Sequence, residues 1–139
     1  MGAVYLATQV ALGRKVAIKV LKPPPSSDLD PSVSARFLKE AEAIARLQHP
    51  NTITVHDFGQ TEDGVPFIIM EFVDGRDLRI AIQEDGIFSL NRTLHVSRQI
   101  CRSLRDAHAH GMIHRDLKPA NVLLTRRRSE AHTPELQSQ

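Results

Sequence analysis

The sequence predicts an α+β fold, in which a strand-rich first half is followed by a helical second half. Short runs of β-branched residues recur up to Val73, on both sides of one amphipathic segment. After Asp74-Gly75 the apolar residues recur at helical spacing instead. Strands and helices that are grouped along the chain, rather than alternating, are typical of the α+β class.

The first strands are predicted from two apolar runs, residues 4–7 and 16–21, on either side of Gly13. Runs rich in β-branched residues around a glycine are typical of an antiparallel hairpin. Residues 23–28 begin with three prolines, which cannot donate to a sheet ladder, so this segment is predicted to be a surface loop.

A helix is predicted to begin at Asp30-Pro31, because aspartate is a favoured N-cap and proline a favoured first helical residue. Its apolar residues recur three and four positions apart, and it is expected to end near His49-Pro50. Two more strands are expected over residues 52–58 and 66–73, joined by a turn at residues 60–64.

The second half is predicted to contain a short helix over residues 77–83 and a longer one over residues 90–110, ended by Gly111. Apolar runs at residues 112–113 and 122–124 flank a polar loop. Residues 125–139 are polar and without periodicity, and they are predicted to form a disordered tail. The longer helix carries an apolar stripe, in which the single cysteine is interpreted as a small buried residue. The stripe consists of Leu94, Ile100, Cys101, Leu104, Ala107 and His108.

Composition and charge narrow the classes of function. The 139 residues are 41% hydrophobic and 24% charged, as in globular proteins, and the formal net charge is +2. So small a charge does not indicate a nucleic-acid partner. No apolar stretch approaches the roughly 18 residues that a membrane span needs, and one cysteine fits a reducing compartment. We therefore expect a cytoplasmic protein without a membrane segment in this chain, and nothing in the sequence indicates its oligomeric state.

Two charged residues of the first half have a possible role in catalysis. Lys19 lies in an apolar strand, from which an ammonium group is able to reach a phosphate, although a lone strand lysine is more often a solvated edge residue. Glu40 lies on the helix that follows and would hold the Lys19 side chain by pairing with it. Alone, Glu40 is better interpreted as part of a solvated helix face.

The segment HRDLKPAN at residues 114–121 is more specific. Asp116 has the chemistry to orient an attacking hydroxyl or accept its proton, and Lys118 has the charge to neutralise a phosphoryl oxygen. Asn121 offers a carbonyl oxygen to a hard divalent cation. Leu117 and Pro119 restrict the backbone between these polar groups, as a rigid site requires.

These features, in this order along the chain, resemble the eukaryotic-like Ser/Thr protein kinases, in particular the bacterial ones. The matching stretches are MGAVYLA, VAIK, KEAEAIARLQHPN, FIIMEFVDG and HGMIHRDLKPANVLL. The resemblance implies a kinase-like N-lobe with its hinge over residues 1–73, made of a twisted antiparallel sheet and one helix. It implies the first helices and the catalytic loop of a mostly helical C-lobe over residues 74–124. It also implies ATP and Mg²⁺ as cofactors and a Ser/Thr hydroxyl of a protein substrate as the acceptor.

The resemblance assigns roles in the loop at residues 114–121. Asp116 would serve the substrate hydroxyl, Lys118 the transferred phosphoryl group, and Asn121 a magnesium ion. His114 and Arg115 would support these residues rather than take part in the reaction.

The resemblance also assigns the nucleotide contacts. Lys19 would bind the ATP phosphates and pair with Glu40. Gly2 would be the end of the phosphate-covering loop, and Met70 would be the gatekeeper. Val4, Ala17 and Leu123 would sandwich the adenine ring. The backbone of Glu71 and Val73 in the hinge would bind the adenine edge.

The family pattern is incomplete in this sequence. The first residues resemble only the last glycine of the G-x-G-x-x-G loop, and nothing after Leu124 reads Asp-Phe-Gly, the tripeptide whose aspartate holds magnesium in kinases. We therefore expect a kinase fragment, truncated at both ends of the domain, whose long helix leaves its apolar stripe uncovered and lowers its stability.

Two alternatives to an active kinase fragment remain. The first is an inactive module that binds a nucleotide or a partner. The second is a small-molecule phosphotransferase of the aminoglycoside-kinase type, which residues 117–119 disfavour. A zinc site at His108, His110 and His114 is not expected, because these residues lack cysteine or carboxylate ligands at a defined spacing.

Overall fold

The computed structural model describes residues 2–21, 30–125 and 135–138, the last range by its backbone only. The chain forms two compact units. The first contains residues 1–46 and 54–72, and the second contains residues 47–53 and 73–139. The sequence predicted one boundary, after Val73, and did not predict that residues 47–53 belong to the second unit.

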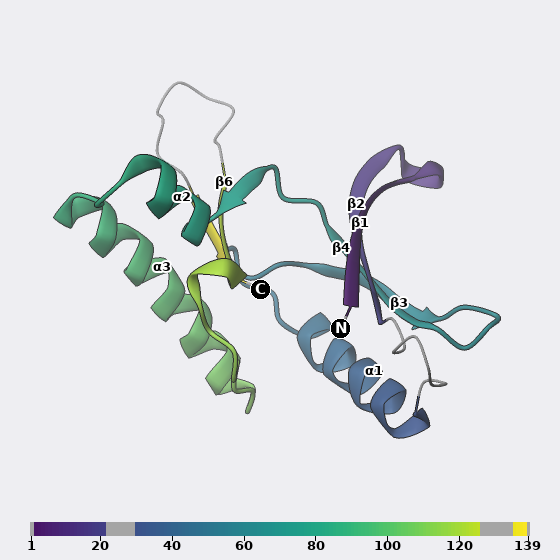
Figure 1. The fold of residues 1–139 in the computed structure, drawn as a ribbon. Helices are drawn as coiled ribbons and strands as arrows, with labels where there is room; N and C mark the ends of the chain where they lie inside the picture. Colours follow the sequence, from purple (N-terminus) through teal and green to yellow (C-terminus); the bar gives the residue numbers. More distant parts are fainter. Residues whose placement is uncertain (1, 22–29, 126–134, 139) are drawn as a thin grey trace. The chain divides into compact units, whose positions relative to one another are not determined.

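The first unit contains a four-stranded antiparallel sheet with the strand order β1-β2-β4-β3 (Figure 1). β1 (Gly2–Gln9) and β2 (Arg14–Leu21) form the predicted hairpin. Its tip is the 3-10 turn η1 (Val10–Leu12) followed by Gly13 at φ 62°, a left-handed conformation that glycine adopts without strain. The loop predicted at residues 23–28 lies outside the described residues.

The remaining strands of this sheet are shorter than predicted. β4 (Pro66–Glu71) lies between β2 and β3 (Val55–Gln60) and ends before Val73. β3 begins at Val55, because Thr52 instead closes a turn in which its backbone N–H donates to the His49 carbonyl oxygen at 2.9 Å.

α1 (Pro31–Ala45) packs against β3 and β4 (Figure 1). The predicted start is confirmed, since the Asp30 carboxylate accepts a hydrogen bond from the Ser32 N–H at 2.8 Å. The helix ends earlier than expected. Arg46 caps it, and the next residue, Leu47, is buried in the second unit rather than continuing the helix.

The second unit contains both predicted helices. α2 (Leu78–Asp85) begins at the N-cap Asp77, and α3 (Leu90–Ala109) begins at the N-cap Ser89, each with a side-chain cap to a backbone N–H. α3 ends at His110, whose Nδ1 lies 2.8 Å from the Asp106 carbonyl oxygen. None of the helices among the described residues has both the length and the apolar character of a membrane span.

A three-stranded antiparallel sheet completes the second unit, in the order β5-β6-β7. β5 (Gly75–Asp77) was not predicted, and β6 (Val122–Thr125) corresponds to the predicted apolar run. β7 (Glu135–Ser138) pairs with β6, so the prediction of a fully disordered tail was wrong for these residues. Pairing satisfies backbone groups that would otherwise form an open edge of β6. Residues 126–134 and 139 of that tail lie outside the described residues.

The core of the second unit lies between α2, α3 and β6. Its buried members are Ala81, Val96, Val122 and Leu124. Leu78, Phe88 and Ile100 pack against them. Val122 and Leu124 alternate with the half-buried Leu123, so one side of β6 faces this core.

The buried face of α3 differs from the predicted apolar stripe. It contains Val96, Gln99 and Ser103, whereas Leu94 is 52% exposed and Cys101 is exposed. At 3.6 residues per turn the observed face is rotated by about a third of a turn from the prediction. The prediction that Cys101 is buried was wrong.

Polar contacts explain this rotation. The Gln99 Oε1 accepts a hydrogen bond from the Asn51 Nδ2 at 2.7 Å, and the Ser103 and Thr52 hydroxyl oxygens lie 2.7 Å apart. Hydrogen bonding removes most of the cost of burying such groups. α3 is therefore anchored to residues 47–53 by a polar face.

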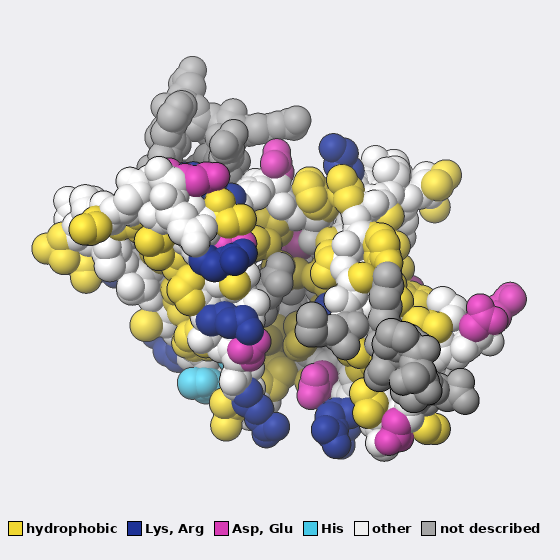
Figure 2. Space-filling model, viewed as in Figure 1, with side chains coloured by type: hydrophobic (Ala, Val, Ile, Leu, Met, Phe, Trp, Pro, Cys, Tyr) yellow, Lys and Arg dark blue, Asp and Glu magenta, His cyan; other side chains and the backbone are white. Residues whose placement is uncertain are grey.

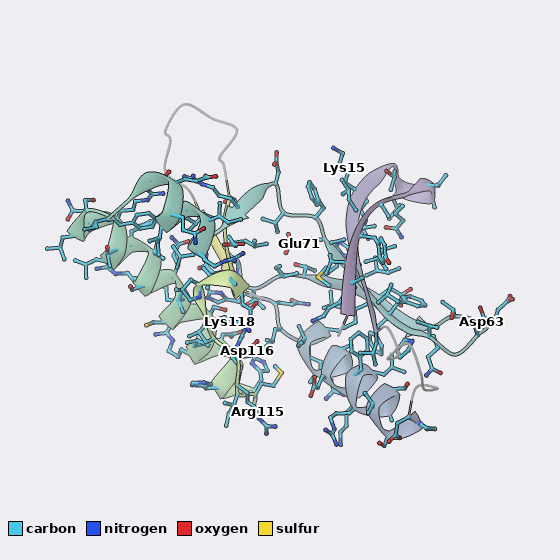
Figure 3. The ribbon with its side chains drawn as sticks, in the orientation of Figure 1. Lys15, Asp63, Glu71, Arg115, Asp116 and Lys118 are labelled. Atoms are coloured by element: carbon cyan, nitrogen blue, oxygen red, sulfur yellow. The ribbon has the colours of Figure 1, made fainter. Side chains whose placement is uncertain are left out.

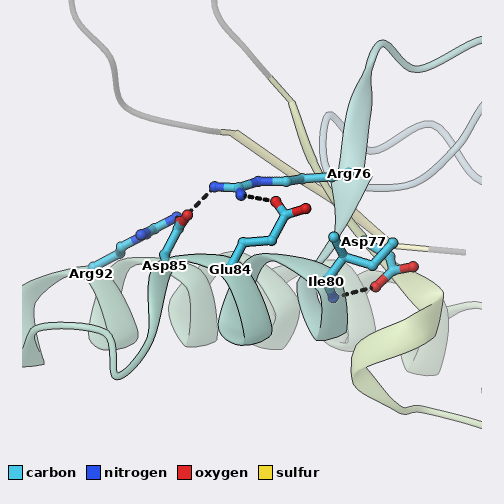
Figure 4. Close-up of polar contacts among 6 residues, drawn as sticks. All are labelled: Arg76, Asp77, Ile80, Glu84, Asp85 and Arg92. Carbon is cyan, nitrogen blue, oxygen red and sulfur yellow. Dashed lines mark hydrogen bonds and ion pairs between the residues drawn. The ribbon is translucent and has the colours of Figure 1, made fainter.

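Ion pairs connect β5 with both helices of the second unit (Figure 4). Arg76 donates to Glu84 and to Asp85, each at 2.5 Å, and Arg92 pairs with Asp85 at 2.8 Å. Arg92 also lies over the Phe88 ring, 3.7 Å from its centroid. The Arg76 guanidinium, and then that of Arg92, hold the pKa of Asp85 below its usual value. The cluster fixes β5, the first element after residue 73, to α2 and α3.

Candidate active site

Four of the predicted nucleotide-binding residues lie on one face of the first sheet. In the register of β2, Lys19 is opposite Val4 of β1, and Ala17 is opposite Met70 of β4. Directly opposed residues share a face, and so do residues two apart on one strand. Val4, Ala17, Lys19 and Met70 therefore face the same side.

Gly2 belongs to the same face, two positions before Val4. A β-carbon at this position would lie 2.9 Å from the Val20 carbonyl oxygen and 3.8 Å from the Lys19 Cε. A larger residue would therefore push β1 away from β2. The missing side chain allows the backbone at Gly2 to lie close to the Val20 carbonyl oxygen, whereas 3.8 Å from the Lys19 Cε is an ordinary contact.

This face presents apolar surface beside a cation. Val4 is 64% exposed and Lys19 is exposed. Figure 2 shows hydrophobic side chains at the surface over the β1–β2 hairpin. An exposed apolar strand next to an ammonium group is suited to a ligand with a flat apolar ring and an anionic tail.

The predicted ion pair between Lys19 and Glu40 is not formed in this structure. Both side chains are exposed, and neither takes part in an ion pair or hydrogen bond with another described residue. An exposed pair gains little, roughly 0–1 kcal/mol, while ordering two long side chains costs entropy. Without a further anion to hold the lysine, the pair has little to stabilise it.

In the second unit, the predicted catalytic residues form one cluster (Figure 3). The Lys118 Nζ donates to both carboxylate oxygens of Asp116, at 3.0 and 2.8 Å. The Asn121 Nδ2 donates to the Asp116 carbonyl oxygen at 2.9 Å and to its carboxylate at 3.1 Å. The loop over residues 116–121 is thus closed by two side chains, those of Lys118 and Asn121, that converge on the Asp116 carboxylate.

The backbone before Asp116 is strained. Arg115 has φ 59°, and the Asp116 N–H donates to the His114 carbonyl oxygen at 2.8 Å across it. Among the described residues, Arg115 is the one non-glycine residue with positive φ, a conformation that costs on the order of 1–3 kcal/mol. Such strain is concentrated at functional sites, and here it lies directly before the predicted catalytic aspartate.

The donor set of the loop fits a magnesium ion in part. Because the Asn121 nitrogen is used by Asp116, its amide oxygen is the group available to a cation, and a hard oxygen is what Mg²⁺ prefers. Among the described residues no three His, Cys, Asp or Glu side chains gather as a metal site. The sequence contains an Asp-Phe-Gly tripeptide at residues 57–59, but it lies in β3, before the loop in the chain and not after it. Its Asp57 carboxylate accepts a hydrogen bond from the Phe58 N–H.

Leu123 and Val73, the other two predicted contacts of the second unit, are both half-buried. Leu123 lies on β6, on the side opposite the core residues Val122 and Leu124. Val73 precedes β5. Sequence reasoning missed one contact near the predicted hinge, a hydrogen bond from the Thr54 N–H to the Glu71 carboxylate, for which no pattern in the sequence gives a signal.

Replacing Lys118 by alanine is expected to raise the pKa of Asp116 toward its usual value. The Lys118 ammonium is the main cause that holds this pKa low, and the Asn121 amide adds to the effect while partial desolvation opposes it. Since a lowered carboxyl pKa means that the charged form is favoured, the variant is expected to take up its proton at a higher pH. A carbon-detected NMR titration of the Asp116 carboxyl measures this. Lys39→Ala is the control, and identical titrations of Lys118→Ala and the unaltered chain would contradict the prediction.

A strand lysine over an apolar sheet face, together with an Asp-Lys-Asn loop, defines the protein kinase class, and the comparisons with known proteins agree. The chain belongs to the protein kinase domain family, which it matches over residues 1–132. Within this family it is similar to several bacterial serine/threonine protein kinases. It is 45% identical over 130 residues to the serine/threonine-protein kinase pkn3 of Myxococcus xanthus, covering 94% of this chain and 23% of that protein. It is 40% identical over 131 residues to PknB of Mycolicibacterium smegmatis, covering 91% of this chain and 20% of that protein.

The fold is also shared with a solved structure. The PknI kinase domain of Mycobacterium tuberculosis matches 99% of this chain with a TM-score of 0.80 and 32% identity. The match covers 53% of that chain, so this sequence corresponds to about half of it. The predicted family and fold class are confirmed.

Proposed function

We propose that the chain carries the ATP-binding and phosphoryl-transfer groups of a cytoplasmic Ser/Thr protein kinase, which moves the γ-phosphate of Mg²⁺-ATP to a hydroxyl of a protein substrate. The observation that supports this most directly is the convergence of Lys118 and Asn121 on the Asp116 carboxylate. Lys118, two residues after the loop aspartate, is the residue that Ser/Thr kinases usually carry at this position, and it supports a Ser/Thr hydroxyl as the acceptor.

The first sheet supplies the nucleotide contacts in this proposal. Lys19 binds the phosphates, and Glu40 pairs with it once the nucleotide orders the lysine side chain. The Glu71 N–H already donates to the Thr54 carbonyl oxygen at 2.9 Å, so its own carbonyl is the group that binds the adenine amino group. Gly2 belongs to the phosphate loop, Met70 is the gatekeeper and Val73 is the second hinge residue. Val4, Ala17 and Leu123 sandwich the adenine ring.

The loop supplies the chemistry. Asp116 is a carboxylate at neutral pH, as an ordinary aspartate is, and Lys118 lowers its pKa further. It is therefore a weak base, suited to orienting the attacking hydroxyl through a hydrogen bond. Lys118 shares its charge between Asp116 and the transferred phosphoryl group. Asn121 would hold the magnesium ion, which neutralises charge on the phosphates when bound.

Nucleotide binding tests the proposal independently of transfer. The 139-residue chain is expected to bind ATP more tightly with Mg²⁺ than without it, and Lys19→Met is expected to weaken ATP binding about 10- to 100-fold, the value of a charge-assisted contact. Isothermal titration calorimetry measures both. Lys39→Met, which removes an exposed lysine from α1, serves as the control. If the unaltered chain does not bind ATP, or if Lys19→Met and Lys39→Met bind it with equal affinity, the proposed nucleotide site is contradicted.

A further inference from the structure

Glu71 is held by two hydrogen bonds to a single residue. Its backbone N–H donates to the Thr54 carbonyl oxygen at 2.9 Å, and its Oε1 accepts from the Thr54 N–H at 2.6 Å. Glu71 is half-buried and ends β4 (Figure 3). A hydrogen bond from a backbone N–H to a carboxylate is stronger than one between two neutral groups.

The side-chain bond lies where the strand pairing stops. The β3–β4 register ends at Val55 opposite Met70, with an irregularity between Val55 and Asp57. Thr54 precedes β3 and lies opposite Glu71 when this register is continued by one residue. In a regular hydrogen-bonded pair the Thr54 N–H would donate to the backbone carbonyl oxygen of Glu71. The Glu71 carboxylate takes the place of that carbonyl as the acceptor, and it extends the ladder by one bond. Strand ends that lack such bonds open more readily than strand centres.

The carboxylate also lies in a charged environment on the same sheet. The pKa of His56 is lowered, first by partial burial and then by Arg14, while Glu71 acts in the opposite direction. Arg14 is itself held by its hydrogen bond to the Gln9 Oε1 at 2.6 Å. Thr54, His56, Glu71 and Arg14 therefore belong to one polar group at this end of the sheet.

We propose that the Glu71 side chain is a positioning residue for the adenine-binding backbone. By binding the Thr54 N–H, it fixes the last residue of β4, whose carbonyl oxygen is the acceptor for the adenine amino group in the proposed function. The inference rests on that function. It adds that base selection depends on a side chain that does not touch the nucleotide.

The chemistry of the two purines gives the readout. Guanine carries a carbonyl oxygen at the position of the adenine amino group, so a fixed carbonyl on the protein attracts adenine and repels guanine. A carbonyl that moves discriminates less well between them. The ratio of ATP to GTP affinity therefore reports on positioning, whereas general unfolding would weaken both nucleotides.

The experiment compares Glu71→Ala, Glu71→Gln and the control Glu62→Ala, an exposed glutamate of the β3–β4 turn, in the full 139-residue chain. Glu71→Ala is expected to weaken ATP binding about five- to tenfold, the value of one hydrogen bond, and to reduce the ratio of ATP to GTP affinity. Glu71→Gln keeps an oxygen that accepts from the Thr54 N–H, so its ATP affinity is expected to stay within about twofold of the unaltered chain. Hydrogen exchange of the Thr54 amide is expected to accelerate in Glu71→Ala alone.

The outcomes separate the inference from the function beneath it. If the unaltered chain binds neither nucleotide, the proposed function fails and the inference with it. If that chain binds ATP, and Glu71→Ala binds it equally well despite faster exchange at Thr54, only the positioning role is overturned. If Glu71→Ala and Glu71→Gln both tighten ATP binding, the carboxylate acts by repelling the triphosphate, which also overturns the proposal.

Discussion

Replacing Asp116 by alanine is expected to lower the rate of γ-phosphate transfer about 10²- to 10⁴-fold, the usual contribution of a positioned acid–base group. The substitution removes the acceptor that would orient the substrate hydroxyl. It also frees the Lys118 ammonium, which donates to both Asp116 oxygens, and removes one of the two acceptors of the Asn121 amide. The rate of transfer from γ-labelled ATP to a generic Ser/Thr acceptor protein measures this effect.

The affinity for ATP separates a catalytic role from a structural one. Asp116 is exposed and lies outside the core, so Asp116→Ala is expected to bind ATP within about twofold of the unaltered chain. Asp63→Ala, at an exposed turn of the first unit, is the control for removing a carboxylate (Figure 3). If the unaltered 139-residue chain binds ATP but transfers no phosphate, then this length of chain holds the ATP-binding site without the transfer activity. Transfer that continues in Asp116→Ala would contradict the role of the aspartate.

Features set by local chemistry were predictable from the sequence. The start of α1 followed from Asp30-Pro31, because a cap and a restricted φ act within a few residues. The hairpin followed from Gly13 between β-branched runs. The cluster in the loop over residues 116–121 was expected from residues at most five apart, with Pro119 limiting the backbone between them.

Features that depend on distant partners were not predictable in the same way. The buried face of α3 is set by Asn51 and Thr52, about fifty positions earlier in the chain, and a search for apolar periodicity does not detect a polar anchor. The missing Lys19–Glu40 pair has a similar cause. The exposed pairs Arg46–Glu42 and Lys118–Asp116 join residues close together in the chain. Lys19 and Glu40 lie on different elements, and an exposed pair between them gains too little to offset the entropy lost by two long side chains. The Glu71–Thr54 bond combines a side chain with a backbone group, which leaves no pattern in the sequence.

Replacing Leu124 by alanine is expected to destabilise the second unit by about 2–5 kcal/mol, the usual cost of removing a large buried aliphatic side chain. Leu124 is 2% exposed and packs in the core with Ala81, Val96 and Val122. The loss combines the transfer free energy of the deleted methyl groups with the cavity left behind, because the backbone of β6 is held on both sides by β5 and β7 and cannot collapse freely. A small domain has only about 5–15 kcal/mol of stability, so this is a large share of it.

Leu123 provides the matched control, one position earlier on the same strand. It is half-buried and lies on the side of β6 away from the core, so Leu123→Ala is expected to cost clearly less than Leu124→Ala. The free energy of unfolding of both variants follows from urea titration monitored by circular dichroism. ATP binding distinguishes Leu123→Ala from Leu124→Ala in a second way. Leu123→Ala removes a proposed adenine contact, so it is expected to weaken ATP binding although this variant remains folded. Equal destabilisation by the two substitutions would mean that β6 does not present one side to the core, and the placement of Leu123 against the nucleotide would then be wrong as well.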